Sequence, residues 1–193
     1  MKQNLLLFVF TIIHFCAAGQ EKVVKDLDND QIKDTVYLDQ EKSIIICRLS
    51  SQRFVKIASK PVEILNETSG IKETKNGFYF YNNWMRAGYS NQFRYNKTLK
   101  KIQLIGMGRY EFGGATNDGS GESSVNLLTN SYIGDWNYYS EKKEKLIKIP
   151  TIKTKMTLPK VFLENFSEEV YFDYADKCSE LFGIEKEKLM KKE

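Results

Sequence analysis

Apolar and polar residues alternate with a period of two along most of this chain, which is the pattern of β-strands with one buried face. Glycine and asparagine turns, such as Asn76-Gly77, separate the alternating segments. Short strands spaced this closely predict an all-β meander, folded as a propeller-like sheet, a sandwich or a barrel. The pattern predicts these strands at 35–38, 43–49, 53–57, 78–81, 91–95, 101–107, 109–112, 123–129, 132–139 and 145–149.

The C-terminal segment changes to the helical period, and its apolar residues fall on one face of a helix that would pack on the sheet. Asn165 and Glu168 are placed to cap the start of that helix, and Gly183 is placed to end it. The sequence therefore predicts one β-rich domain at 20–183 that ends in a helix, followed by a charged tail at 184–193. The apolar face of the helix comprises Tyr171, Tyr174, Ala175, Cys178, Leu181 and Phe182.

Residues 1–19 have the composition of a secretory signal peptide. An early lysine precedes an apolar run, and Ala17-Ala18-Gly19 provides small residues before the cleavage point. This predicts a periplasmic or secreted protein. Membrane contact is expected only if Cys16 is lipidated. Phe15 disfavours this, because a lipid-attachment signal has a small residue at that position.

Cleavage after Gly19 would remove His14, the only histidine of the chain. The mature protein would then lack any Ser-His-Asp triad, Cys-His dyad or histidine zinc site. A carboxylate pair for glycoside hydrolysis remains open, with Glu111 and either Glu122 or Asp118 as candidates. Because nothing in the sequence singles out one pair, we predict that the protein is not an enzyme and keep a carboxylate-dependent glycoside hydrolase as an alternative.

Charge and cysteine content limit the partners and the covalent links. The whole chain carries a formal net charge of +4, and loss of Lys2 with the signal peptide leaves +3. This mild excess is spread along the chain rather than clustered in a stripe, so no nucleic-acid partner is expected. Two cysteines remain after cleavage, Cys47 and Cys178. An oxidising compartment permits a disulfide between them, and two buried free thiols are the alternative.

One loop concentrates carboxylates at alternate positions, in the order D-L-D-N-D-Q-I-K-D over residues 26–34. Alternate residues of a tight loop can direct their oxygens to one centre, and Ca²⁺ takes six to eight oxygen ligands at about 2.3–2.6 Å. The loop is not an EF-hand, because Gln31 and Tyr37 stand where that loop has glycine and glutamate. A hydrated, metal-free turn is the alternative. The predicted calcium ligands are the side chains of Asp26, Asp28, Asp30 and Asp34 and the carbonyl of Ile32.

A second group of candidates combines aromatic rings and guanidinium groups with the two acids of the glycine-containing loop at 117–122. Such combinations bind sugars and protein partners. The alternative is that the rings fill the core, the arginines cap a sheet edge and the loop is an ordinary hairpin loop. The candidate ligand- or partner-binding residues are Trp84, Arg86, Tyr89, Arg109, Asp118 and Glu122.

The acidic loop resembles the calcium loops of FG-GAP/VCBS repeats and dockerin-like modules, which carry glycine at the position of Gln31. Four later features follow it in order: F-R-Y at 93–95, K-K-I-Q-L-I-G at 100–106, an acidic Gly-Ser loop and S-x-N-L-L-T at 124–129. With them the chain is similar to a family of secreted bacterial β-proteins that includes periplasmic immunity proteins against lysozyme-like effectors. The resemblance implies a propeller-like fold with bound calcium that plugs the cleft of a peptidoglycan hydrolase. We therefore expect an extracytoplasmic, calcium-stabilised binding protein that inhibits such a hydrolase, with a glycan-binding envelope module as the alternative.

Overall fold

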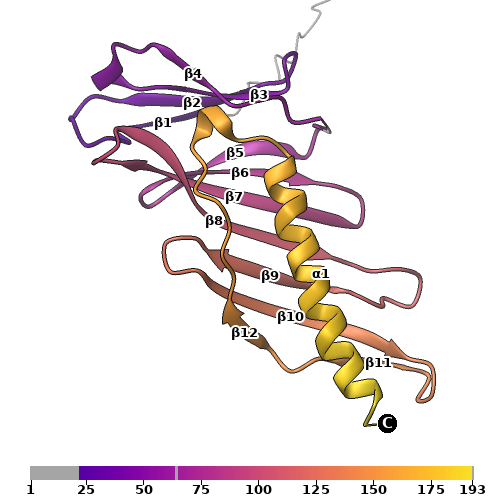
Figure 1. The fold of residues 1–193 in the computed structure, drawn as a ribbon. Coiled ribbons are helices and arrows are strands. Elements are labelled where there is room, and N and C mark those ends of the chain that lie inside the picture. Colours follow the sequence, from indigo (N-terminus) through magenta and orange to yellow (C-terminus); the bar gives the residue numbers. More distant parts are fainter. Residues whose placement is uncertain (1–21, 64, 193) are drawn as a thin grey trace, which may run out of the picture.

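The structure, a computed structural model, describes residues 22–63 and 65–192. In this part of the chain the strands form two open antiparallel sheets, and one long helix lies at the C-terminus (Figure 1). The predicted class, all-β with a C-terminal helix, is confirmed. The signal peptide predicted at 1–19 lies outside the described residues. Within the described ranges, no helix combines the length and the apolarity needed to cross a membrane.

The first sheet contains four strands in sequence order: β1 Lys22–Lys25, β2 Asp34–Asp39, β3 Ile44–Arg48 and β4 Lys56–Ala58. Buried and half-buried residues alternate along β2, so one of its faces packs on the core. β3 is buried at four successive residues, which means that both of its faces are covered. A 3₁₀ turn, η1 Ser50–Gln52, follows β3 and lies beside the acidic loop.

The second sheet contains eight strands and has the order of a meander. The strands from β5 to β11 lie side by side in chain order, and β12 pairs with β10. On the side away from β9, β10 pairs with β12 along its first half and with β11 along its second half. The bounds are β5 Ser69–Thr74, β6 Gly77–Asn83, β7 Ala87–Asn96, β8 Lys101–Glu111, β9 Gly121–Asn126, β10 Ser131–Ser140, β11 Lys145–Lys148 and β12 Ile152–Lys155.

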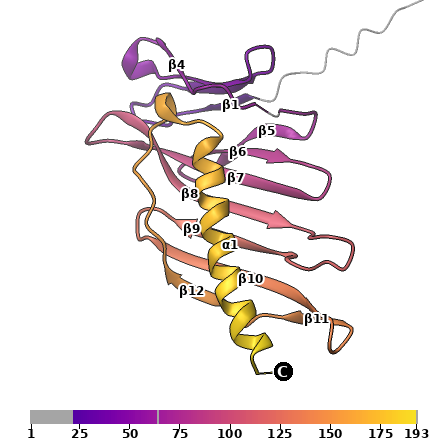
Figure 2. The same cartoon turned by 45° about the vertical axis from the view of Figure 1, so that its right-hand side comes forward.

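Helix α1, Glu169–Met190, crosses one face of the large sheet, as both views show (Figures 1 and 2). The face predicted from the sequence is the one that packs, and its Tyr174 and Cys178 are fully buried. Burial alternates along β10, so its other side chains point to the face that α1 leaves open. The sheet therefore has one dry face and one wet face.

Phe166, which lies just before α1, joins the two sheets. Its ring packs edge-on against Phe80 and Phe93, with ring centroids 6.3 and 5.2 Å away. Its carbonyl accepts a hydrogen bond of 2.9 Å from the N–H of Lys60, two residues beyond β4. The hydrophobic core thus continues from the small sheet through this segment into the large sheet.

The strand predicted at 53–57 is wrong over most of its length. Arg53 and Phe54 have left-handed backbones, with φ of 55° and 57°, and they complete the turn after η1, so β4 begins only at Lys56. The sequence pattern also gives no signal for β1, β5 and β12, which are short edge strands with several polar residues.

The boundary between the helix and a charged tail at 184–193 is also wrong, because α1 continues through Gly183 to Met190. A Cβ built at Gly183 meets no atom within 4 Å, and the backbone there is not left-handed. Gly183 therefore weakens the helix without ending it. The predicted cap does not form either: Asn165 lies in a separate 3₁₀ turn, η2 Leu163–Asn165, and Glu168 precedes the helix without a side-chain capping bond.

We expect Gly134→Ala to destabilise the protein and Gly183→Ala to stabilise it. A Cβ at Gly134 would lie 2.3 Å from the Tyr132 hydroxyl and 2.7 Å from Trp136 Nε1, two buried groups that are hydrogen-bonded to each other. Overpacking of this kind costs about 1–3 kcal/mol, whereas replacing glycine by alanine within a helix gains roughly 0.5–1 kcal/mol. Urea denaturation measures both free energies of unfolding. A Gly134→Ala variant as stable as the parent protein would contradict this packing.

Candidate functional site

The acidic loop connects β1 to β2, and its last carboxylate is the most constrained. Asp34, the first residue of β2, is fully buried. Its Oδ2 accepts a hydrogen bond from the Leu27 N–H at 2.7 Å, and its Oδ1 accepts from the N–H and the hydroxyl of Ser50 at 2.8 and 3.0 Å. Asp34 therefore ties both the start of the loop and the 3₁₀ turn η1 to β2.

Asp26 fixes the backbone of the loop. Its carboxylate accepts hydrogen bonds from the N–H groups of Asn29 at 2.7 Å, Asp30 at 3.2 Å and Gln31 at 3.0 Å. The backbones of Asn29 and Gln31 are left-handed, with φ of 67° and 71°. Gln31 stands where FG-GAP/VCBS loops carry glycine. Its left-handed backbone conformation is one that glycine adopts at little energetic cost.

Three of the four predicted carboxylate ligands converge. One oxygen each from Asp26, Asp28 and Asp34 lies within 4.8 Å of the other two. A single cation could contact all three, since Ca²⁺–oxygen distances are about 2.3–2.6 Å. The cluster can therefore hold a metal ion.

Asp30 is not part of this group, so the geometry of the loop does not support its predicted role as a ligand. Its oxygens accept hydrogen bonds from the Ser50 hydroxyl at 2.6 Å and from the Ile32 N–H at 2.8 Å. These two donors lower the pKa of Asp30. The role of the Ile32 carbonyl stays a prediction.

The electrostatics of the cluster also favour a cation. Burial raises the pKa of the Asp28 carboxyl, and the negative charges of Asp34 and Asp30 raise it further. A hydrogen bond from the Ser51 hydroxyl lowers the pKa but does not outweigh these effects. A raised pKa means that the fold resists a negative charge at Asp28, and a bound cation would remove that cost. Carboxylate oxygens are ligands for hard cations such as Ca²⁺ and Mg²⁺.

Tyr89 and Trp84 belong to the core rather than to a binding platform. Tyr89 is 2% exposed, and its ring stacks on that of Tyr171 in α1 with centroids 3.9 Å apart. Its hydroxyl donates to Oε1 of buried Glu168 at 3.0 Å, and burial raises the pKa of Tyr89. Trp84 packs edge-on against Tyr89 at 5.4 Å. The prediction that Tyr89 binds a ligand is therefore wrong, because α1 covers its face of β7; Trp84 is half-buried in the same cluster.

Arg86 lies in the exposed loop between β6 and β7 and binds the loop after β8. Its guanidinium donates hydrogen bonds of 3.0–3.3 Å to the carbonyls of Phe112, Gly113 and Gly114. The Phe112 N–H donates in return to the Arg86 carbonyl at 2.8 Å. Next to this junction Met85 is 92% exposed and Phe112 is 53% exposed. We call Met85, Arg86 and Phe112 the apolar tip.

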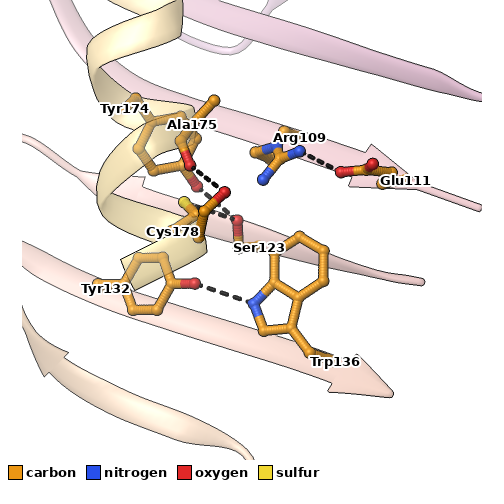
Figure 3. Close-up of polar contacts among 9 residues, drawn as sticks. Arg109, Glu111, Ser123, Tyr132, Trp136, Tyr174, Ala175 and Cys178 are labelled. Atoms are coloured by element: carbon orange, nitrogen blue, oxygen red, sulfur yellow. Dashed lines mark hydrogen bonds and ion pairs between the residues drawn. The ribbon is translucent and has the colours of Figure 1, made fainter. Parts of the chain in front are cut away.

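Arg109 lies between the large sheet and α1, where Figure 3 shows its guanidinium paired with Glu111. It also lies over the ring of Trp136, 5.2 Å from the centroid. Its side chain is 9% exposed, so it is a packing residue of this interface rather than an open binding residue.

Both cysteines are free, buried thiols, which decides between the two alternatives that the sequence left open. Sγ of Cys178 lies 3.5 Å from the Ser123 hydroxyl, which also hydrogen-bonds the Tyr174 hydroxyl at 2.8 Å (Figure 3). Cys47 is enclosed in β3 of the other sheet, where burial raises the pKa of its thiol. The two residues belong to different layers of the fold.

Asp118 anchors the last turns of α1. Its carboxylate accepts hydrogen bonds from the Tyr139 N–H at 2.8 Å and from the Lys186 ammonium at 2.8 and 3.0 Å. Partial burial acts to raise the pKa of Asp118, but these donors outweigh it and the pKa is lowered. The carboxylate of Asp118 is therefore already hydrogen-bonded within the protein rather than free to bind a ligand.

Glu111 and Glu122 lie on opposite faces of the large sheet. Glu111 pairs with Arg109 on the face that α1 covers. Glu122 is exposed and directly precedes Ser123, whose side chain contacts α1, so Glu122 points to the open face. The candidate pair of Glu111 and Glu122 is therefore not assembled, and Asp118, the other candidate partner of Glu111, is bonded to Lys186.

Sequence reasoning named Arg86 but missed Met85 and Phe112 of the apolar tip, and it missed the hydroxyls that bond the acidic loop. Ser50 and Ser51 bond carboxylates 16 to 23 residues earlier, and only the fold brings them together. The available signal for the tip was a methionine between an aromatic residue and an arginine in a loop.

No protein-family model matches the chain, and no curated protein or solved structure shows significant similarity to it. Its function has to be inferred from the geometry of the acidic loop and the apolar tip and from the resemblance of its motifs.

We expect Gln31→Gly to stabilise the metal-free protein by about 1 kcal/mol. A left-handed backbone costs roughly 1–2 kcal/mol for a residue with a Cβ, and the entropy of unfolded glycine offsets only part of that gain. Lys33→Gly is the matched control: its backbone is not left-handed, so this variant should lose roughly 0.5–1 kcal/mol. Chelator-treated samples are compared by urea denaturation. Equal losses in the two variants would refute the left-handed geometry of Gln31.

Proposed function

We propose that this protein is an extracytoplasmic binding protein whose N-terminal sheet is stabilised by a calcium ion in the acidic loop. The proposed metal site rests on one observation: carboxylate oxygens of Asp26, Asp28 and Asp34 lie within 4.8 Å of one another. The signal-like composition of residues 1–19 supports a location outside the cytoplasm, where calcium is abundant.

The loop suits Ca²⁺ better than Mg²⁺. Crowded carboxylates and the loop backbone offer many oxygens, which matches the six to eight ligands and flexible geometry of Ca²⁺. Mg²⁺ demands near-octahedral geometry and keeps several of its waters. An ion among these residues would join the end of β1 to the start of β2, and through Asp34 to η1, so its role is structural.

Calorimetric titration of the chelator-treated mature protein with CaCl₂ tests the metal site. We expect one Ca²⁺ to bind, and the melting temperature to rise because the ion binds only the folded loop; at 100 times the dissociation constant the gain is about 2.7 kcal/mol. Asp28→Ala should abolish both effects. Asp30→Ala is the matched control and should keep Ca²⁺ binding, because its carboxylate is turned to Ser50. The absence of binding at millimolar Ca²⁺ would overturn the proposal.

The apolar tip supports binding to a protein partner. Interface hot spots are large side chains that are held rigid before binding. Met85 and Phe112 are exposed, and the hydrogen bonds of Arg86 fix the two loops that carry them. The resemblance to immunity proteins against lysozyme-like effectors supplies the kind of partner, a peptidoglycan hydrolase whose cleft the tip would enter.

Inhibition assays against a panel of lysozymes and cell-wall amidases test this partner. We expect inhibition of at least one enzyme and a loss of at least about tenfold in Met85→Asp, since truncating a hot spot costs about 2 kcal/mol or more. Val55→Asp is the control: Val55 is 63% exposed and lies outside the tip. Both variants should keep their stability within about 0.5 kcal/mol. Equal inhibition by both variants would exclude the tip, and no inhibition across the panel would exclude the function.

A further inference from the structure

We propose that a cleft between the acidic loop and the turns of the large sheet binds a carboxylate-bearing saccharide. The cleft has a volume of about 600 Å³, which is within the range of roughly 300–1,000 Å³ for ligand sites. It is lined by residues of the β1–β2 loop and of the β5–β6 and β7–β8 turns. Its polar lining includes Asn29, Lys75, Asn76, Arg94, Lys97 and Thr98.

Three cationic side chains line the cleft without an ion pair in the part of the chain that the structure describes. Among the described residues, Lys75, Arg94 and Lys97 make no side-chain hydrogen bond or ion pair. Lys25 beside them is already occupied, because its ammonium donates to Glu73 at 2.7 Å and to two carbonyls at 2.9 and 3.1 Å. Arg94 is half-buried, so part of its hydration is lost with no carboxylate to replace it. A ligand carrying negative charge would supply that partner.

The cleft contains little negative charge of its own. Asp26 is the only carboxylate among the described residues that line it, and its oxygens already accept three loop N–H bonds. The apolar side chains of Leu27 and Ile105 also line the cleft and lower the local dielectric. The field of three like charges is therefore focused on one concave surface, which selects an anion.

The remaining polar groups match a saccharide. The side chains of Asn29, Asn76 and Thr98 make no hydrogen bond within the described chain, and each offers both a donor and an acceptor. Sugar hydroxyls both donate and accept hydrogen bonds, so they need partners that offer both donors and acceptors. An extended peptide would instead bind a free strand edge, but β7 and β8, which supply Arg94 and Ile105, are each paired on both sides.

The cleft is coupled to the metal loop, because Asp26 and Asn29 belong to both. An ion that orders this loop would order one wall of the cleft. In this one respect the inference rests on the proposed calcium site; the charge of the cleft does not depend on it.

Calorimetric titrations with two carboxylated probes, a hyaluronan tetrasaccharide and trigalacturonate, test the inference in the calcium-loaded protein at low salt. We expect at least one to bind, and neutral chitotetraose not to bind. Arg94→Gln should weaken binding by about ten- to one-hundredfold, the effect of losing a charged hydrogen-bonding group. Binding should also be lost at about 1 M salt, where the screening length is roughly 3 Å.

A charge-matched pair of variants separates the cleft from general attraction. Replacing Lys75, Arg94 and Lys97 by glutamine should abolish binding, whereas replacing the exposed Lys145, Lys153 and Lys177 by glutamine should not. Binding of neither carboxylated probe, equal losses in the two triple variants, or tighter binding of a tetraglutamate peptide would each overturn the inference. Saccharide binding without calcium binding would refute the metal site and leave the cleft standing. Calcium binding without saccharide binding would refute the saccharide cleft and leave the metal site standing.

Discussion

The large sheet needs a cover for its apolar face, and the rest of the structure depends on how the chain provides it. An open antiparallel sheet of eight strands is stable in water only when one face is packed. After β12 the chain returns across the sheet through Val161, Leu163 and Phe166, which are buried, and then forms α1. The N–H of Leu104 donates to the Val161 carbonyl at 3.0 Å, so this returning segment is fixed before the helix begins.

The same segment also positions the small sheet, and with it the acidic loop. The Phe166 carbonyl holds the Lys60 backbone, and Oε2 of Glu168 accepts a hydrogen bond from the Glu63 N–H at 3.1 Å. The Lys25 ion pair with Glu73 joins the end of β1 to β5. A change that detaches α1 would therefore also disturb the carboxylate cluster, because the two sheets share one core.

The pattern of apolar residues along the chain predicted most strands and the helix, but not which elements pack against one another in the fold. The period of two identified the long inner strands, and the period of 3.6 identified the helix face with Tyr174 and Cys178, because burial imposes these periods directly. The pattern failed at 53–57, where left-handed residues complete a turn that no pattern of apolar residues reveals. It also could not assign Tyr89 to the core, since the sequence does not say which face of a strand a distant helix will cover. In the acidic loop, spacing predicted four converging carboxylates, and three of them converge. Asp30 instead accepts a hydrogen bond from the hydroxyl of Ser50, which lies in the turn after β3.

The meander explains why the two proposed binding surfaces lie at different ends of the molecule. In consecutive antiparallel hairpins, connections alternate between the two ends of the sheet. The β5–β6 and β7–β8 turns contribute Lys75 and Lys97 to the cleft at one end, next to the acidic loop. The β6–β7 and β8–β9 connections therefore meet at the other end, where Arg86 joins them into the apolar tip. A rigid sheet separates the two surfaces, so each can change in sequence without disturbing the packing of the other; only a loss of the shared core would affect both.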